Sequence, residues 1–199
     1  MDPRKAWLVD LDGTLYSAKP VKLLMGLELL LLGAKHLPKI RAFRKEHERL
    51  REEQVDCAGD PFGKQIERTA QRLHCPPADL QRVVRDWMVR RPGKWIRRFR
   101  NRVLLKEIEQ YRAAGGRCAL VSDYPARSKL KALGVEEHFE VVVANGEPGG
   151  PSQLKPNPAG YLEAARRLGV QPEDCLVIGD REDADGDAAR AACMAFRLV

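Results

Sequence analysis

Three short apolar runs of the chain each end in a polar side chain. The runs and their polar ends are Trp7–Val9 with Asp10, Cys118–Val121 with Ser122, and Leu176–Ile178 with Asp180. Apolar runs of this length are typical of strands that are buried on both faces of a sheet. The segments Phe139–Val143 and Phe196–Val199 have a similar composition and are predicted as further strands.

Segments with helical spacing alternate with these strands in the second half of the chain. They are Val103–Ala114, Ser128–Leu133, Pro158–Leu168 and Gly186–Ala192. Gly134 and Gly169 directly follow two of them, where a glycine commonly ends a helix. This alternation predicts an α/β fold, in which a parallel sheet carries helices on both faces. The active residues of such folds lie at the carboxyl ends of the strands.

The region between Thr14 and about residue 100 lacks this alternation. It contains long helical patterns separated by prolines, which are Pro20, Pro38, Pro61, Pro76, Pro77 and Pro92. Residues 13–100 hold 20 Lys or Arg against 10 Asp or Glu, a net charge of +10, whereas the rest of the chain carries −3. We therefore expect a basic helical unit inserted into the α/β core. Its basic positions, including the dense cluster at 90–100, indicate either attraction of an anionic substrate or a solvated helix face.

The most hydrophobic segment, Val21–Leu32, belongs to this insertion. Lys22 and Glu28 interrupt it, and it is shorter than the about 20 apolar residues that are needed to cross a bilayer. We predict a helix that packs in a helical bundle and roofs the active site. Contact with a membrane surface and a pocket for an apolar substrate tail are the alternatives.

Asp10 and Asp12 form the pattern with the clearest chemical meaning. Because side chains alternate in an extended segment, both carboxylates project from the same side of the strand end. Two like charges side by side are costly unless a cation lies between them or one carboxyl holds a proton. For this pair alone, a solvated acidic turn is the alternative. A further candidate, Lys155, lies in a loop that Pro156 and Pro158 stiffen.

The order of the motifs resembles that of the haloacid dehalogenase superfamily, in its phosphatase-like branch. The motifs are Asp10-Leu-Asp12-Gly-Thr14, the strand ending in Ser122, Lys155-Pro156, and Gly179-Asp180 followed after four residues by Asp185. The resemblance covers nearly the whole chain. It implies a Rossmann-like core formed by residues 1–16 and 101–199. Residues 17–100 would form a helical cap of the C1 type, inserted between the first two motifs.

The resemblance also implies a role for each motif residue. Asp10 would be the nucleophile that forms an aspartyl-phosphate, and Asp12 would be the general acid and base. The ligands of Mg²⁺ would be Asp10, the backbone carbonyl of Asp12, Asp180 and Asp185. Asp183 is an alternative to Asp185, but the motif spacing favours Asp185. The phosphoryl oxygens would contact Ser122, Asp123 and Lys155, with Asp123 standing where an amide residue is more usual.

The predicted function is therefore a Mg²⁺-dependent phosphatase that acts on a small phosphorylated metabolite. A phosphomutase shares every motif and stays an alternative, whereas Asp12 argues against haloacid dehalogenation. A receiver-type signalling domain would carry its phosphoacceptor on a middle strand and would lack a cap. A non-catalytic module that binds nucleic acid or a membrane surface through the basic cap would give no reason for both Asp10 and Asp12.

Composition adds an expectation about the cellular setting. The five cysteines include no CxxC pair, so neither a disulfide framework nor zinc is indicated. Asp10 and Asp12 interrupt the only early apolar run, so we expect no secretory signal and a cytoplasmic location. Nucleic acid is not an expected partner. The substrate and the oligomeric state have no signature in the sequence.

Overall fold

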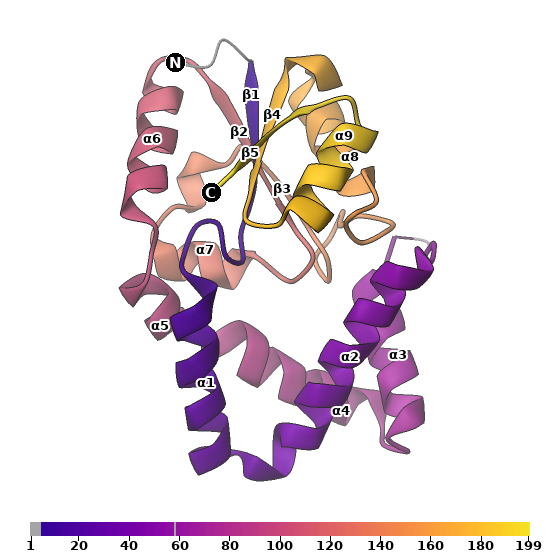
Figure 1. Ribbon diagram of the computed structural model, residues 1–199. Helices are drawn as coiled ribbons and strands as arrows, with labels where there is room; N and C mark the ends of the chain where they lie inside the picture. The colour runs from indigo at the N-terminus through magenta and orange to yellow at the C-terminus, as the bar shows by residue number, and fades with distance from the viewer. Residues whose placement is uncertain (1–4, 58) are drawn as a thin grey trace.

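The fold is built on a five-stranded parallel sheet (Figure 1). The computed structural model describes residues 5–57 and 59–199, so residues 1–4 of the predicted core lie outside the described residues. The strands are β1 (Ala6–Asp10), β2 (Arg117–Ser122), β3 (Val141–Ala144), β4 (Cys175–Gly179) and β5 (Ala195–Leu198). They lie in the order β3-β2-β1-β4-β5, and neighbouring strands are parallel. The prediction of an α/β fold with a parallel sheet is confirmed.

The central strand β1 aligns the strand ends that carry the predicted site. Asp10 lies opposite Val121 of β2, and Val9 lies opposite Ile178 of β4. Because the strands are parallel, the residues that follow β1, β2 and β4 emerge at one edge of the sheet. Strand β2 lies on one side of β1 and strand β4 lies on the other, so the strand order reverses direction at β1. Ligands of open α/β sheets bind at such a switch point.

Helices cover both faces of the sheet. They are α6 (Arg102–Ala113), α7 (Arg127–Leu133), α8 (Ala159–Leu168) and α9 (Asp187–Ala191), with 3-10 turns at Glu136–His138 and Pro172–Asp174 and a π-helical segment at Glu182–Gly186. One apolar cluster joins Trp7 and Val9 of β1 to α6 and α7. A second cluster joins Leu8 to Tyr161 and Leu168 of α8. Successive residues of β1 thus pack against opposite faces of the sheet.

The observed element bounds agree closely with the predicted ones. Helices α7 and α8 end where expected, at Gly134 and Gly169, whose φ angles are 73° and 66°. Only glycine adopts such angles freely, so both positions suit a helix end. Strand β3 starts at Val141 rather than Phe139, since the 3-10 turn Glu136–His138 brings the chain to the sheet just before it.

The residues between β1 and α6 form a group of helices that lies below the sheet in Figure 1. They are α1 (Ala18–Leu32), a 3-10 turn (Ala34–His36), α2 (Leu37–Glu53), α3 (Pro61–Arg72), α4 (Pro77–Val84), a π-helical segment (Arg85–Arg90) and α5 (Gly93–Arg98). A third apolar cluster packs α2, α3, α4 and the π-helical segment together through Phe43, Phe62, Leu80 and Trp87. Helices α3 and α4 each begin with a proline, as the sequence punctuation predicts.

Helix α1 confirms a helix in the most hydrophobic segment, but only part of it is packed. Val21 and Leu29 are buried, whereas Leu23 and Leu31 are each 73 % exposed. Leu27, Leu30 and Leu32 are exposed as well. The expectation that this segment packs within a bundle is therefore wrong for one face. Leucines occur on nearly every side of the helix, so its hydrophobicity does not indicate which side is buried. Within the described residues, no helix is long and apolar enough to cross a membrane.

Candidate active site

A cavity of about 400 Å³ lies between the carboxyl edge of the sheet and the inserted helices. Its wall combines residues from the loops after β1, β2 and β4 with residues of α1 and α2. The charged residues of the core in this wall are Asp10, Asp12, Asp123, Lys129, Lys155, Asp180, Arg181 and Asp185. Apart from Ser122, every residue that the sequence predicts for catalysis, phosphate binding or metal binding contributes to it. The fold thus gathers these residues from segments that are far apart in the chain.

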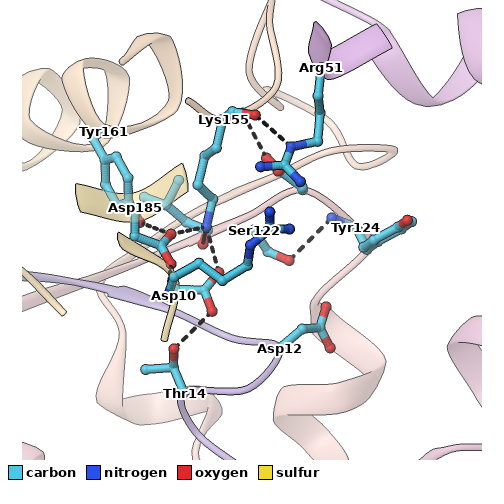
Figure 2. Close-up of polar contacts among 12 residues, drawn as sticks. Asp10, Asp12, Thr14, Arg51, Ser122, Tyr124, Lys155, Tyr161 and Asp185 are labelled. Carbon is cyan, nitrogen blue, oxygen red and sulfur yellow. Dashed lines mark hydrogen bonds and ion pairs between the residues drawn. The ribbon is translucent and has the colours of Figure 1, made fainter. Parts of the chain in front are cut away.

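Asp10 is held at the end of β1 by a network of short polar contacts (Figure 2). Lys155 Nζ lies 2.5 Å from Asp10 Oδ1 and 2.7 Å from Asp185 Oδ1. Thr14 Oγ1 donates to the other oxygen of Asp10 at 2.9 Å, and Tyr161 OH donates to Asp185 Oδ1 at 2.7 Å. One buried lysine therefore bridges the carboxylates that follow β1 and β4.

Burial and neighbouring charges set the protonation of this network. Burial raises the pKa of Asp10 to about 8, although Lys155 opposes the rise, while Asp185 adds to it. Burial alone would lower the pKa of Lys155, but the charges of Asp10 and Asp185 raise it well above its usual value. Burial and the charge of Asp185 also raise the pKa of Asp180. The carboxylates outweigh the one lysine, so a bound cation would favour their ionised forms.

The carboxylates of Asp10, Asp180 and Asp185 form a group that suits a metal ion. One oxygen of each residue lies within 4.8 Å of the others. A set of carboxylate oxygens fits a hard cation such as Mg²⁺. Two glycines leave the space that this requires. A Cβ atom on Gly13 would lie 1.9 Å from Asp180 Oδ2, and one on Gly179 would lie 2.4 Å from Asp185 Cγ.

The two late aspartates occupy different environments. Asp185 is 2 % exposed, and its Oδ2 accepts a hydrogen bond from the backbone N–H of Arg181 at 3.2 Å. Asp183 is exposed and forms an ion pair of 2.6 Å with the side chain of Arg181, which lowers the pKa of Asp183. The geometry therefore places Asp185, and not Asp183, beside Asp10 and Asp180.

Asp12 lies beside this group, but its side chain has partners of its own. Lys129 Nζ lies 2.6 Å from both carboxylate oxygens, and Tyr16 OH donates to Oδ1. Burial alone would raise the pKa of Asp12, but Lys129 and the hydrogen bond from Tyr16 lower it. Contact of the backbone carbonyl of Asp12 with a metal stays a prediction.

Ser122 is the last residue of β2, and Asp123 follows it. Ser122 Oγ accepts from the backbone N–H of Tyr124 at 3.2 Å. Asp123 Oδ1 accepts from the backbone N–H of Lys155 at 3.3 Å, and the Asp123 carbonyl accepts from Asn145 Nδ2 at 3.2 Å. Asp123 therefore helps to position the Lys155 loop. A direct role of Ser122 and Asp123 in phosphate binding stays a prediction.

Four residues of this network carry no signal in the sequence. They are Tyr16, Arg51, Lys129 and Tyr161, none of which belongs to a motif. Lys129 comes from the first turn of α7, and Tyr161 from α8. Arg51 comes from α2, and its Nε donates to the backbone carbonyl of Lys155 at 2.8 Å. Tyr16 contacts Asp12 within one turn of the chain. The other three meet the site only through the tertiary fold, so no local pattern marks them.

Comparisons with known proteins agree with this geometry. A family model described as haloacid dehalogenase-like hydrolase matches residues 5–192. Glyceraldehyde 3-phosphate phosphatase of Methanopyrus kandleri is 47 % identical over 66 residues, which span 33 % of this chain but only 27 % of that protein. Phosphoglycolate phosphatase of Nitrosospira multiformis is 28 % identical over an alignment of 204 residues with gaps, and the alignment covers 96 % of this chain and 80 % of that protein.

A solved structure shows the same fold over the full length of the chain. The magnesium-bound HAD-hydrolase YfnB of Bacillus subtilis aligns with a TM-score of 0.69 at 14 % identity, and the alignment covers 100 % of this chain and 89 % of that one. The family model extends over strands β1 to β4 and over the inserted helices alike. It confirms both the resemblance that the motif order indicates and the expectation of a hydrolase. The chain belongs to the haloacid dehalogenase-like hydrolases.

Proposed function

We propose that the protein is a Mg²⁺-dependent phosphatase that hydrolyses a phosphate monoester of a small metabolite through an aspartyl-phosphate on Asp10. The position of Asp10 carries this proposal. Its carboxylate lies in the cavity wall, 2.5 Å from Lys155 Nζ and beside the carboxylates of Asp180 and Asp185. An anionic nucleophile can approach an anionic phosphoryl group only where positive charge offsets the repulsion. The phosphatase names of both relatives agree with the proposal.

In the first step, a carboxylate oxygen of Asp10 attacks phosphorus and the bond to the ester oxygen breaks. Lys155 offsets the negative charge that gathers on the phosphoryl oxygens. Asp12 gives to the leaving oxygen the proton that it took from water in the preceding turnover, and this oxygen departs as an alcohol. A Mg²⁺ ion held by Asp10, Asp180 and Asp185 would neutralise further charge on the phosphoryl group.

In the second step, Asp12 is ionised and accepts a proton from a water molecule. The oxygen of that water attacks the phosphorus of the aspartyl-phosphate, the bond to Asp10 breaks, and inorganic phosphate leaves. Lys129 and Tyr16, which hold the carboxylate of Asp12, keep it oriented through both steps. Ser122 and Asp123, at the end of β2, complete the proposed phosphate site.

We also propose that residues 17–100 act as a cap on the core formed by 1–16 and 101–199. The third apolar cluster gives these helices a core of their own. Arg51 of α2 contacts the backbone of Lys155, so the helices touch the catalytic loop directly. Helices α1 and α2 and the π-helical segment Arg85–Arg90 supply much of the remaining cavity wall. A cap in this place excludes water from the aspartyl-phosphate.

A screen of phosphorylated metabolites with Mg²⁺ present tests the function. Inorganic phosphate released from at least one ester, and lost when a chelator removes the metal, would support it. Transfer of the phosphoryl group to a second hydroxyl of the substrate, without release of phosphate, would instead indicate a phosphomutase. No turnover of any ester, including the activated ester p-nitrophenyl phosphate, would contradict both.

The metal site gives a prediction with a matched control. Asp185→Asn is expected to raise the Mg²⁺ concentration for half-maximal activity by about tenfold or more, because it removes one charge from the group of carboxylates. Asp183→Asn, which changes an exposed carboxylate two positions earlier, should leave this concentration unchanged. Calorimetric titration of both variants with Mg²⁺ measures binding independently of turnover. Equal behaviour of the two variants would rule out Asp185 as a metal residue.

The basic cap gives a second prediction. Arg41 and Arg44 are exposed residues in the cavity wall, whereas the described wall does not include Arg97 and Arg98 of α5. Replacing Arg41 and Arg44 by Gln should raise KM several-fold at low ionic strength, and the effect should fade as salt screens the charges. The matched pair of Gln substitutions at Arg97 and Arg98 should leave KM unchanged. A salt-independent change in KM would show that the arginines do not act by steering.

A further inference from the structure

The part of the cavity wall that the inserted helices supply is mainly apolar. Met25 and Leu29 come from α1, Leu37 and Ile40 come from α2, and Trp87 and Met88 come from the π-helical segment. Leu29, Ile40 and Trp87 also belong to the third apolar cluster, so this wall is the inner surface of a packed core. The phosphate end of the cavity is charged, and most of the residues that the inserted helices add to the wall are apolar.

Neutral hydrogen-bonding groups are scarce in the same wall. Among the described residues, it contains no serine, threonine, asparagine or glutamine. The hydroxyl of Tyr16 is already bonded to Asp12. The ring of His47 contacts Gln65 through Nδ1 at 3.2 Å and stacks on Tyr124 with ring centroids 4.4 Å apart. A substrate rich in hydroxyl groups, such as a sugar phosphate, would bury much of its polar surface against these apolar side chains, which is costly.

The charged side chains that the inserted helices add to the wall are either exposed or paired. Lys22, Arg41 and Arg44 are exposed. Burial raises the pKa of Asp180, and the nearby charge of Lys22 opposes this rise. Lys22 therefore lies toward the phosphate end of the cavity. Glu48 is paired with Arg51 at 3.0 Å. Apart from the paired Arg51, the charged side chains that the helices add are therefore exposed, and apolar residues form most of the rest of this wall.

From this distribution we infer that the substrate is a phosphate monoester of an apolar alcohol, whose hydrocarbon part packs against α1, α2 and the π-helical segment. The inference rests on the proposed phosphatase function. The volume of about 400 Å³ lies within the range of pockets that bury most of a small ligand. Both relatives are named for short polar substrates, glyceraldehyde 3-phosphate and phosphoglycolate, so the inferred substrate class differs from theirs.

Alkylphosphonates with chains from ethyl to octyl test this inference, because their carbon–phosphorus bond resists hydrolysis. Binding to the full chain with Mg²⁺ present is measured by calorimetry. The dissociation constant is expected to fall about threefold with each added methylene until the cavity is filled, since each buried methylene gains hydrophobic free energy. A dissociation constant that does not depend on chain length would overturn the inference.

Two variants of α1 locate the binding surface. Met25 is half-buried in the cavity wall, whereas Leu27 is 53 % exposed on the outside of the same helix. Met25→Gln should weaken octylphosphonate binding by about tenfold and leave ethylphosphonate binding nearly unchanged. Leu27→Gln should bind like the unmodified chain. If Leu27→Gln causes the loss and Met25→Gln does not, the alkyl chain binds outside the cavity and the inference is wrong. Thermal unfolding of both variants shows that their folds are intact.

Turnover of p-nitrophenyl phosphate by the same preparations separates this inference from the proposed function. Turnover together with binding that ignores chain length would leave the phosphatase standing and overturn the apolar substrate class. Binding that depends on chain length, without turnover of p-nitrophenyl phosphate or octyl phosphate, would overturn both, because the apolar wall would then belong to a binding protein. Turnover with chain-length-dependent binding supports the inference.

Discussion

Asp10→Asn is expected to abolish turnover while the fold is retained. The amide cannot form the aspartyl-phosphate, so the reaction loses its covalent route, and kcat should fall about 10⁴-fold or more. The substitution preserves shape, and with the amide oxygen turned toward Lys155, the amide NH2 can donate to the hydroxyl of Thr14. Lys155 also keeps its contact with Asp185. Release of p-nitrophenol at saturating Mg²⁺ measures the loss, and thermal unfolding measures the fold.

A surface carboxylate serves as the control for this variant. Asp187 is exposed and pairs with Arg190 at 2.6 Å at the start of α9. Asp187→Asn should keep the full rate, so an effect common to both variants would reflect a general disturbance. A rate in Asp10→Asn that is comparable with the unmodified chain would eliminate Asp10 as the nucleophile. Covalent phosphate trapped in the unmodified chain, and absent from Asp10→Asn, would identify the intermediate directly.

The sequence predicts the core well because its signals are local. Buried parallel strands appear as short apolar runs, and the residues at their carboxyl ends, such as Asp10 and Asp180, follow those runs directly. The glycines that end α7 and α8 need positive φ angles, which few other residues adopt freely. The fold class and the meeting of Asp10 and Asp180 at one edge therefore follow from pattern and topology, whereas the choice of Asp185 rests on the resemblance to the family.

The partners of Asp12 could not be predicted, because they arise only from packing. Lys129 lies in a helix of ordinary composition, and its amine reaches Asp12 only when α7 packs against β1. Tyr16 lies four residues after Asp12, a spacing that has no meaning outside this turn. The sequence thus identifies the reactive carboxylates, while the groups that control their protonation become visible only in the folded chain.

Helix α1 shows a different limit. Its leucines predict a helix but not which side of the helix is buried, because an apolar helix has no polar face to mark the solvent side. The structure turns Met25 and Leu29 toward the cavity and leaves Leu23 and Leu31 exposed. Hydrophobicity alone leaves open the alternative of a pocket for an apolar substrate tail. The orientation of Met25 and Leu29 favours this alternative.

Asp12→Asn is expected to lower turnover of a poor leaving group by about 10² to 10⁴-fold, the range for a lost general acid. An alkyl phosphate needs a proton on its leaving oxygen, whereas p-nitrophenolate leaves without one. The first step with p-nitrophenyl phosphate should therefore remain fast, and a burst of p-nitrophenol equal to the enzyme concentration should precede slow hydrolysis of the aspartyl-phosphate. Rapid-mixing absorbance measurements resolve the burst. Steady-state phosphate release from the alkyl ester measures the loss of turnover, which should exceed the loss in the first step with p-nitrophenyl phosphate.

Tyr16→Phe separates removal of the carboxyl from disturbance of its surroundings. This variant removes the hydroxyl that donates to Asp12 but keeps the ring in the apolar cluster and keeps the contact with Lys129. Because the carboxyl remains, any loss should be small and similar for alkyl and p-nitrophenyl esters. If Asp12→Asn slows the first step equally for both leaving groups, Asp12 does not supply the proton. The ion pair with Lys129 would then be its main contribution, and Lys129→Met should reproduce the defect of Asp12→Asn.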